Sequence, residues 1–206
     1  MLDAALLSKY GVKSPDSALA SSLAGAQASA RKIGFPVAMK AVSKKAVHKS
    51  EIGGVILGIR DAEEAGRAYS LLLRRCKGIP LEGILVQKMA GGPSSVELIV
   101  GGKRDAQFGQ LIMLGLGGIF VEVFRDVSFR VCPITEADAL EMMRELKSYP
   151  ILAGARGRKP VNEKALSSTL VRVSNLLMKE DPAEFDINPL IADSKGCVAV
   201  DARMLR

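Results

Sequence analysis

The sequence predicts an α+β protein made of two small lobes. Helical segments lie at the start and in the third quarter of the 206-residue chain, and short apolar strand candidates fill most of the rest. Apolar residues make up 48% of the chain, enough to bury a core, so the chain is not disordered. A break over residues 86–93 separates two groups of elements. We therefore expect an N-terminal lobe over residues 1–85 and a C-terminal lobe over residues 86–206.

In the N-terminal lobe, a short helix is expected over residues 2–9 and a second over residues 14–34, with Gly34 just past its end. The apolar runs "FPVAMKAV" and "GVILGI" then predict two strands. Asp61 is placed to cap a helix that begins at residue 62 and ends near residue 76, with Glu64 completing a capping box.

The C-terminal lobe opens with a series of short strand candidates, "GILVQKM", "SVELIVGGK", "QLIMLGL", "IFVEVF" and "SFRVCPI". Thr135 and Asn162 are each placed to cap a helix, the first running to residue 147 and the second to about residue 179. The chain then predicts two strands joined by a turn over residues 193–196.

The composition of the chain argues against some classes of function and favours others. No apolar segment approaches the roughly 20 residues of a membrane helix, and no signal peptide is recognisable, so we expect a cytoplasmic protein without membrane contact. The three cysteines lie far apart and are expected to be buried fillers. The net charge of +7 favours an anionic partner. Nucleic acid is one candidate, but basic residues are scattered and aromatics make up only 4%, so phosphorylated small molecules fit at least as well.

The stretch "AMKAVSKKAVHKSEIGGV" combines features of a phosphate cradle. Glycines such as Gly53 and Gly54 let backbone N–H groups approach an anion, and lysines supply charge. Lys40 lies inside an apolar strand, so it either points to solvent or sits under a buried anion. His48 is either a surface or packed histidine or a nucleophile that carries a phosphoryl group.

Oxygen-bearing side chains gather near the C-terminus in "EFDINPL" and "VAVDAR". Asp186 and Asn188 are two residues apart, so they share a face of a strand, and Asp201 comes beside them if the two terminal strands pair. Hard oxygens in this arrangement suit Mg²⁺. The alternative is a polar strand edge closed by a turn.

The segment "VQKMAGGPSSVELIV" suggests a hinge. Its backbone, near Gln87 and Met89, is suited to pair with an adenine edge. Glu97 lies in an otherwise apolar strand and needs a partner, either a ribose hydroxyl or a cation such as Arg104.

In their order along the chain, "YGV", "IGFPVAMKAVSKKAVHKSEIGGV", "LVQKM", "VELIVGGKRDAQFG", "LGLGGIFVEVFRDVSFRVCPI" and "EFDINPL…VDAR" resemble the ATP-grasp β subunits of ADP-forming acyl-CoA synthetases, acetate–CoA ligases above all. Succinyl-CoA synthetase β subunits are more distantly similar. The resemblance covers nearly the whole chain and implies an ATP-grasp fold, in which two α+β lobes hold the nucleotide between them.

The resemblance also implies roles for individual residues. They are the phosphate-binding Lys40, the histidine of phosphoryl transfer His48, the following turn Gly53 and Gly54, the adenine hinge Gln87 and Met89, the ribose-side acid Glu97, and the magnesium ligands Asn188 and Asp201 with Asp186 beside them.

The reaction implied is ATP + carboxylic acid + CoA ⇌ ADP + phosphate + acyl-CoA, an acid–thiol ligation. The chain would bind ATP or ADP with Mg²⁺ and exchange a phosphoryl group with a phosphohistidine on a CoA-binding α subunit. The family suggests an α2β2 assembly, active only when both subunits are present. The alternative is a non-catalytic ATP-binding regulatory module of the kind fused to acetyltransferases.

Overall fold

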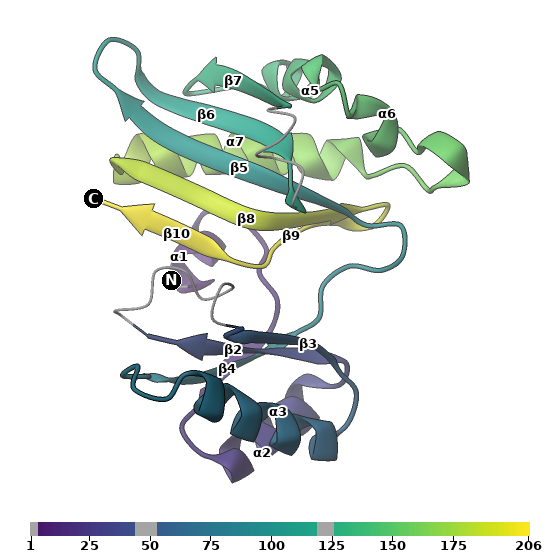
Figure 1. Ribbon diagram of the computed structural model, residues 1–206. Coiled ribbons are helices and arrows are strands. Elements are labelled where there is room, and N and C mark those ends of the chain that lie inside the picture. Colours follow the sequence, from purple (N-terminus) through teal and green to yellow (C-terminus); the bar gives the residue numbers. More distant parts are fainter. Residues whose placement is uncertain (1–3, 44–52, 119–125) are drawn as a thin grey trace. The chain divides into compact units, whose positions relative to one another are not determined.

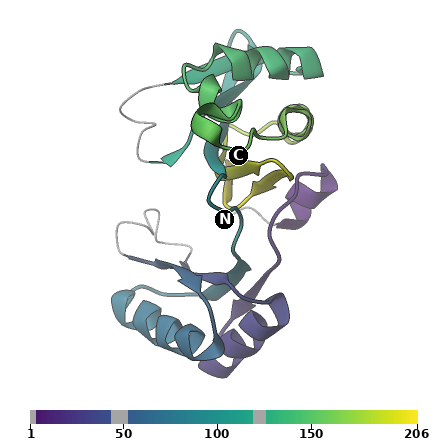
Figure 2. The same cartoon turned by 90° about the vertical axis from the view of Figure 1, so that its right-hand side faces the viewer.

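The computed structural model describes residues 4–43, 53–118 and 126–206. The chain forms two compact units, one over Pro15–Met89 and the other over Met1–Ser14 together with Ala90–Arg206. Each unit holds one antiparallel sheet with helices packed against one of its faces (Figures 1 and 2). We call the sheet of the Pro15–Met89 unit sheet A and the sheet of the other unit sheet B.

Sheet A has the strand order β1-β4-β2-β3. Its strands are β1 (Ser17–Ala20), β2 (Val37–Val42), β3 (Val55–Ile59) and β4 (Gly83–Lys88). Helices α2 (Leu23–Ile33) and α3 (Ala62–Arg75) cover one face (Figure 1). Every second residue of β2 and β4 enters the core beneath these helices, including Val37, Met39, Ala41, Ile84 and Val86.

The predicted helix over residues 14–34 is wrong in its first part. Residues 17–20 form strand β1, which pairs antiparallel with β4, and α2 begins only at Leu23. Ser22 caps α2, because its hydroxyl oxygen accepts a hydrogen bond from the N–H of Gly25 at 3.1 Å. The prediction failed because the pairing of β1 with a strand more than sixty residues away overrides the local helical pattern.

The predicted cap of the next helix is confirmed, whereas the predicted capping box is not. Asp61 caps α3, since its carboxylate accepts a hydrogen bond from the N–H of Glu64 at 2.7 Å. Glu64 does not complete a capping box with Asp61; its carboxylate accepts instead from the backbone N–H and the guanidinium of Arg60. α3 ends at Arg75, one residue before the predicted end.

Sheet B has the order β10-β8-β5-β6-β7, and β9 also pairs with β8. Its strands are β5 (Val96–Asp105), β6 (Gly109–Leu116), β7 (Val127–Val131), β8 (Glu184–Asp193), β9 (Gly196–Ala199) and β10 (Ala202–Leu205). The helical segments of this unit are α1 (Ala4–Lys9), α5 (Glu136–Glu145), α6 (Tyr149–Leu152), the 3₁₀ turn η2 (Ala155–Gly157) and α7 (Glu163–Glu180). Thr135 and Asn162 cap α5 and α7 as predicted.

α7 packs directly on β5. A Cβ atom built at Gly102 would collide with the side chain of Leu177, so a larger residue here would require Leu177 to move. Leu98 and Val100 lie on the same side of β5 and belong to the core beneath α7. The predicted strand "IFVEVF", which includes Glu122, lies outside the described residues.

The N-terminal helix belongs to the unit of sheet B. The Tyr10 hydroxyl donates to the carboxylate of Glu180 at 2.7 Å, Lys9 pairs with the same carboxylate, and Arg172 donates to the Gly11 carbonyl at 2.6 Å. The division of the chain therefore differs from the expected lobes 1–85 and 86–206. Strand β4 also continues to Lys88, past the expected boundary.

The three cysteines are buried and not in disulfides, as the sequence predicts. Burial raises the pKa of the Cys132 thiol and raises the pKa of the Cys197 thiol to about 12, which disfavours a reactive thiolate at either position. Among the described residues, no helix is long and apolar enough to cross a membrane.

Candidate nucleotide site

Lys40 lies in the middle of strand β2 and is only 7% exposed. Its neighbours Met39 and Ala41 point into the core beneath the helices. Because side chains alternate along a strand, Lys40 lies on the face of sheet A that α2 and α3 do not cover. A lysine kept at low exposure on such a face offers a positive charge to an anionic ligand.

Gln87 shares this face. It stands opposite Ala38 in the β2–β4 ladder, two residues from Lys40 along β2, and is 5% exposed. A buried amide beside a buried ammonium provides both a charge and a donor–acceptor pair on one surface. Sheet A thus brings together two residues that are 47 positions apart in the sequence.

Met89, which follows strand β4, has part of its backbone already bonded. Its N–H donates to the carbonyl of Pro36 at 3.2 Å, and the N–H of Lys88 donates to the carbonyl of Asp16 at 2.8 Å. A base edge at this point would therefore meet the carbonyl of Met89 rather than a free N–H. The sequence did not single out Lys88, whose ammonium also bonds locally to two carbonyls.

Gly53 and Gly54 form the turn that leads into β3. Gly53 has a φ of 65°, a conformation that favours glycine, and its carbonyl accepts from Arg75 at 3.1 Å. The Gly54 carbonyl accepts from the N–H of Ala41, which joins the turn to the strand that carries Lys40. His48, which precedes this turn, lies outside the described residues.

Sheet B carries the acidic residues. Phe185 and Ile187 of β8 point into the core beneath α7, which leaves Asp186 and Asn188 on the uncovered side. The N–H of Asn188 donates to the carbonyl of Asp201 at 3.0 Å, so the two residues face each other across the ladder. The predicted second terminal strand is divided into β9 and β10. Both pair with β8, and Asp201, which lies between them, stands beside Asn188.

The β8 strand is irregular at this point. Leu98 pairs with Leu190 and Val100 with Ile187, so the register with β5 shifts by one residue around Asn188. Asn188 is exposed at this bulge. Ile187 and Leu190, the β8 residues that pair with β5 on either side of the bulge, are buried. Bulges re-aim side chains, and this one presents the Asn188 amide away from the core.

The carboxylates near Asp186 affect its ionisation. Burial raises the pKa of Asp186, and the neighbouring carboxylates of Asp201 and Glu184 raise it further, while Arg203 opposes them. A cation bound there would relieve this repulsion. Within the described ranges, no group of three or more His, Cys, Asp or Glu side chains could hold a metal ion, so a cation here would use two carboxylates, the Asn188 amide and other oxygen ligands.

Glu97 lies on the uncovered face of β5, between Val96 and Leu98 of the core. Its carbonyl accepts from the N–H of Gly117 at 2.7 Å. A Cβ atom at Gly117 would lie 2.8 Å from the backbone of Glu97, and one at Gly118 would lie 3.7 Å from its carboxylate. The "GLGG" motif, which matched no nucleotide-loop pattern, therefore allows a close backbone approach to Glu97.

Arg104 is not the partner of Glu97. It pairs with Asp181 at 2.8 Å, near the end of α7, and Asp105 accepts from the backbone of its own turn.

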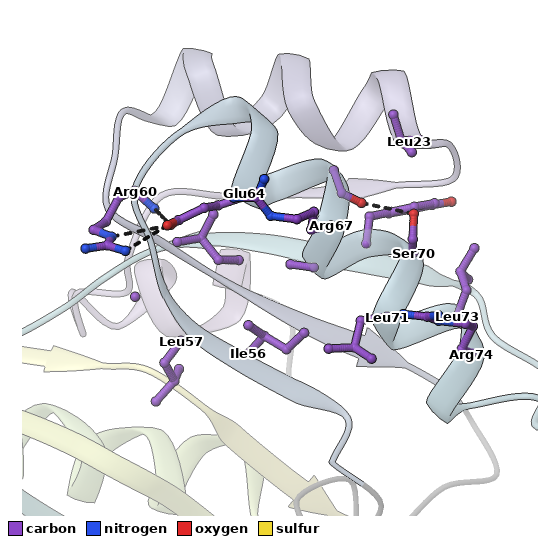
Figure 3. Close-up of a pocket in the computed structure, with 15 residues that line it drawn as sticks. Leu23, Ile56, Leu57, Arg60, Glu64, Arg67, Ser70, Leu71, Leu73 and Arg74 are labelled. Carbon is purple, nitrogen blue, oxygen red and sulfur yellow. Dashed lines mark hydrogen bonds and ion pairs between the residues drawn. The ribbon is translucent and has the colours of Figure 1, made fainter.

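A shallow pocket of about 1300 Å³ lies between α3 and β3, and Figure 3 shows its lining. Apolar side chains such as Leu57 and Leu73 alternate there with Arg67, Arg74 and the Arg60–Glu64 ion pair. None of the described site residues named above lines it.

Comparison with known proteins assigns the chain to a family. Residues 2–205 match the model of the ATP-grasp domain. The chain is 46% identical over 205 residues to the β subunit of acetate–CoA ligase (ADP-forming) I from Pyrococcus furiosus, covering 97% of this chain and 88% of that one.

Two solved structures of an acetyl-coenzyme A synthetase from Candidatus Korarchaeum cryptofilum share the fold. One, in complex with coenzyme A and Ca-AMPCP, has a TM-score of 0.92 and 45% identity over 98% of this chain and 89% of that one. The other contains coenzyme A and Mg-AMPPCP, with its phosphohistidine segment pointing towards the nucleotide binding site. It has a TM-score of 0.84 and 44% identity over 97% of this chain and 87% of that one.

The two antiparallel α+β units, the family match over nearly the whole length and the high identity to a β subunit agree with one another. The chain belongs to the ATP-grasp domain family and, within it, to the β subunits of ADP-forming acetate–CoA ligases.

Proposed function

We propose that the chain is the nucleotide-binding subunit of an ADP-forming acetyl-CoA synthetase. It exchanges a phosphoryl group between ADP and a phosphohistidine on a CoA-binding α subunit, within the reaction ATP + acetate + CoA ⇌ ADP + phosphate + acetyl-CoA. The observation that carries the proposal is the Asp186–Asn188–Asp201 cluster, which a bulge and a strand pairing assemble on the uncovered face of sheet B.

The residues of sheet A are suited to the anionic and base ends of a nucleotide. The ammonium of Lys40 neutralises phosphate oxygens, and it does so strongly because the side chain is buried and water competes little. The turn at Gly53 and Gly54 offers backbone N–H groups to the same oxygens. Gln87 and the carbonyl of Met89 hold the adenine edge, while Glu97 of sheet B accepts a ribose hydroxyl.

Asp186, Asn188 and Asp201 fit Mg²⁺, because they combine two carboxylates with an amide oxygen and leave positions for phosphate and water. When bound, Mg²⁺ supplies Lewis-acid stabilisation of the charge on the transferred group. In the ADP-phosphorylating direction, a terminal oxygen of ADP attacks phosphorus. The bond between phosphorus and the histidine nitrogen breaks, and the imidazole keeps the electron pair.

His48 takes part in this transfer in our proposal, as the resemblance implies. Its ring would stabilise the transferred group or carry it covalently. We further propose assembly with the α subunit as an α2β2 complex in the cytoplasm, where ATP, CoA and the partner occur together.

Calorimetry of the isolated chain with Mg-ADP and Mg-ATP tests the proposal. We expect saturable binding that requires Mg²⁺, and turnover only after an α subunit is added. Replacing exposed Lys179 with methionine provides a control that removes a lysine outside the site. Absence of binding at millimolar nucleotide and Mg²⁺ would contradict the proposal.

A further inference from the structure

Lys88 makes an unusual set of contacts at the end of strand β4. Its ammonium donates hydrogen bonds to the carbonyl of Gly34 at 2.8 Å and to the carbonyl of Phe35 at 2.9 Å. These carbonyls lie at the C-terminal end of α2, where the helix dipole favours a positive charge. Both are charge-assisted bonds from a half-buried side chain, so the contact is stronger than an ordinary surface interaction.

The sheet register shows that Lys88 is not a ligand of the nucleotide-facing surface. Lys88 stands opposite Val37, a residue of the core beneath the helices. Gln87, the preceding residue, stands on the other face with Lys40. Successive side chains of a strand point to opposite faces, so the Lys88 ammonium lies on the helix side of the sheet.

Lys88 instead joins two segments that carry the candidate site. The turn 34–36 opens strand β2, which holds Lys40, and residues 88–89 follow Gln87 in the hinge. Besides the two ammonium bonds, the N–H of Met89 donates to Pro36 at 3.2 Å. Three hydrogen bonds thus connect the start of β2 to the hinge, and two of them come from one side chain.

We infer that Lys88 is a positioning residue that sets the hinge for base recognition. It holds the backbone of residues 88–89, and hence the carbonyl of Met89 and the side chain of Gln87, against the strand that carries Lys40. A polar site discriminates between bases only when its donors and acceptors are held in place. This inference rests on the proposed nucleotide function and deepens it.

The experiment compares Lys88→Met with Lys88→Arg in calorimetric titrations with Mg-ATP and Mg-GTP. We expect Lys88→Met to weaken binding of the preferred nucleotide roughly tenfold, about the value of one lost hydrogen bond, and to leave the other nearly unchanged. Lys88→Arg, which keeps the charge and can reach both carbonyls, should restore most of the preference. In the complex with the α subunit, Lys88→Met should raise the KM for the preferred nucleotide and leave kcat within about twofold of the wild-type value.

Lys32→Met is the matched control. Lys32 lies in the last turn of α2, so its removal takes a positive charge from the same helix end. A general effect of charge would appear in both variants, whereas a positioning effect appears only at Lys88.

Several outcomes overturn the inference. They are a Lys88→Met chain with wild-type affinities, an equal loss for both nucleotides, and a wild-type chain without base preference. Failure of the wild-type chain to bind either nucleotide would instead remove the proposed function itself. If Lys88→Met does not fold, Lys88→Gln replaces it under the same criteria, because its shorter, uncharged side chain loses the charge-assisted bonds to the two carbonyls.

Discussion

Sheets A and B present opposite chemistry on the faces that their helices leave uncovered. Sheet A offers a buried ammonium and a buried amide, Lys40 and Gln87. Sheet B offers carboxylates, Asp186, Asp201 and Glu97, with an amide from Asn188. A nucleotide with its metal needs both kinds of group, because phosphate oxygens bind cations while Mg²⁺ and ribose hydroxyls bind carboxylates. In our proposal, sheet A supplies the groups for phosphate, and sheet B those for the metal and the ribose.

The largest effects should come from exchanging these polar groups for neutral ones, one sheet at a time. Lys40→Met and Asp201→Asn are each expected to lower turnover about 100- to 1000-fold, the range seen when one stabilising group of a transferred charge is lost. Lys40→Met should also weaken nucleotide binding at saturating Mg²⁺. Asp201→Asn should mainly raise the Mg²⁺ concentration needed for half-maximal rate. Steady-state kinetics of the complex with the α subunit measures both.

The same two variants also test whether the two sheets differ in this way. If Asp201→Asn leaves the Mg²⁺ dependence unchanged, sheet B is not the metal-binding half. A folding control is needed for both variants, so that loss of structure is not mistaken for loss of a functional group. Thermal unfolding provides this control.

A smaller effect concerns the edge of sheet B. Glu145 of α5 accepts hydrogen bonds from Arg130 and Ser128 of β7. Arg130, then Ser128, lowers the pKa of Glu145 to about 2. The resulting stability is complete above the ordinary pKa of the carboxyl, near 4.5, and is lost as the pH falls to about 2. Because the Glu145 side chain is 49% exposed, screening limits the effect to about 0.5 kcal/mol.

Glu145→Gln should therefore be slightly less stable than the wild-type chain at pH 7, and the difference should shrink as the pH falls from 4.5 to 2. Urea unfolding at several pH values measures it. Glu63→Gln on α3 of the other unit is the control, because Glu63 is 83% exposed and pairs with Arg67 on the same helix. A difference that stays constant down to pH 2 would refute the ion-pair origin.

The smallest expected effect concerns backbone strain, which differs between the two units. Among the described residues, the non-glycine positions with positive φ are Arg156 at 57° and Asp181 at 46°, and both belong to the unit of sheet B. Asp181 receives hydrogen bonds from Arg104 and Gln110. Within the described ranges, the Arg156 side chain forms no hydrogen bond or ion pair. Arg156→Gly should raise stability by about 0.5 kcal/mol, because relief of the left-handed strain exceeds the added entropy of glycine.

Asp181→Gly should instead lower stability, since it removes two hydrogen bonds along with the strain. Chemical unfolding of the two variants decides the sign of each change. Stabilisation by both substitutions would mean that the Asp181 contacts contribute little.

Helix caps and strand identities were readable from the sequence because they depend on residues only a few positions apart. Asp61, Thr135 and Asn162 begin helices where the sequence predicts them. Glu64 lies in the first turn of α3 as predicted. Its carboxylate does not complete a capping box with Asp61, because Arg60 competes for it. Strand β1 was missed, because its stability comes from pairing with β4 rather than from its own four residues.

By itself, the sequence determined the α+β class and most of the elements, the helix caps, the burial of the cysteines and the alternation that puts Asp186 and Asn188 on one side of a strand. These follow from local propensity and from the period of two along a strand. Only the tertiary structure decided that Lys40 is buried, that Asp201 faces Asn188, that residues 1–14 join the unit of sheet B, and that Lys88 joins β2 to the hinge. Each of these depends on residues brought together from distant parts of the chain, and no local pattern records such a pairing.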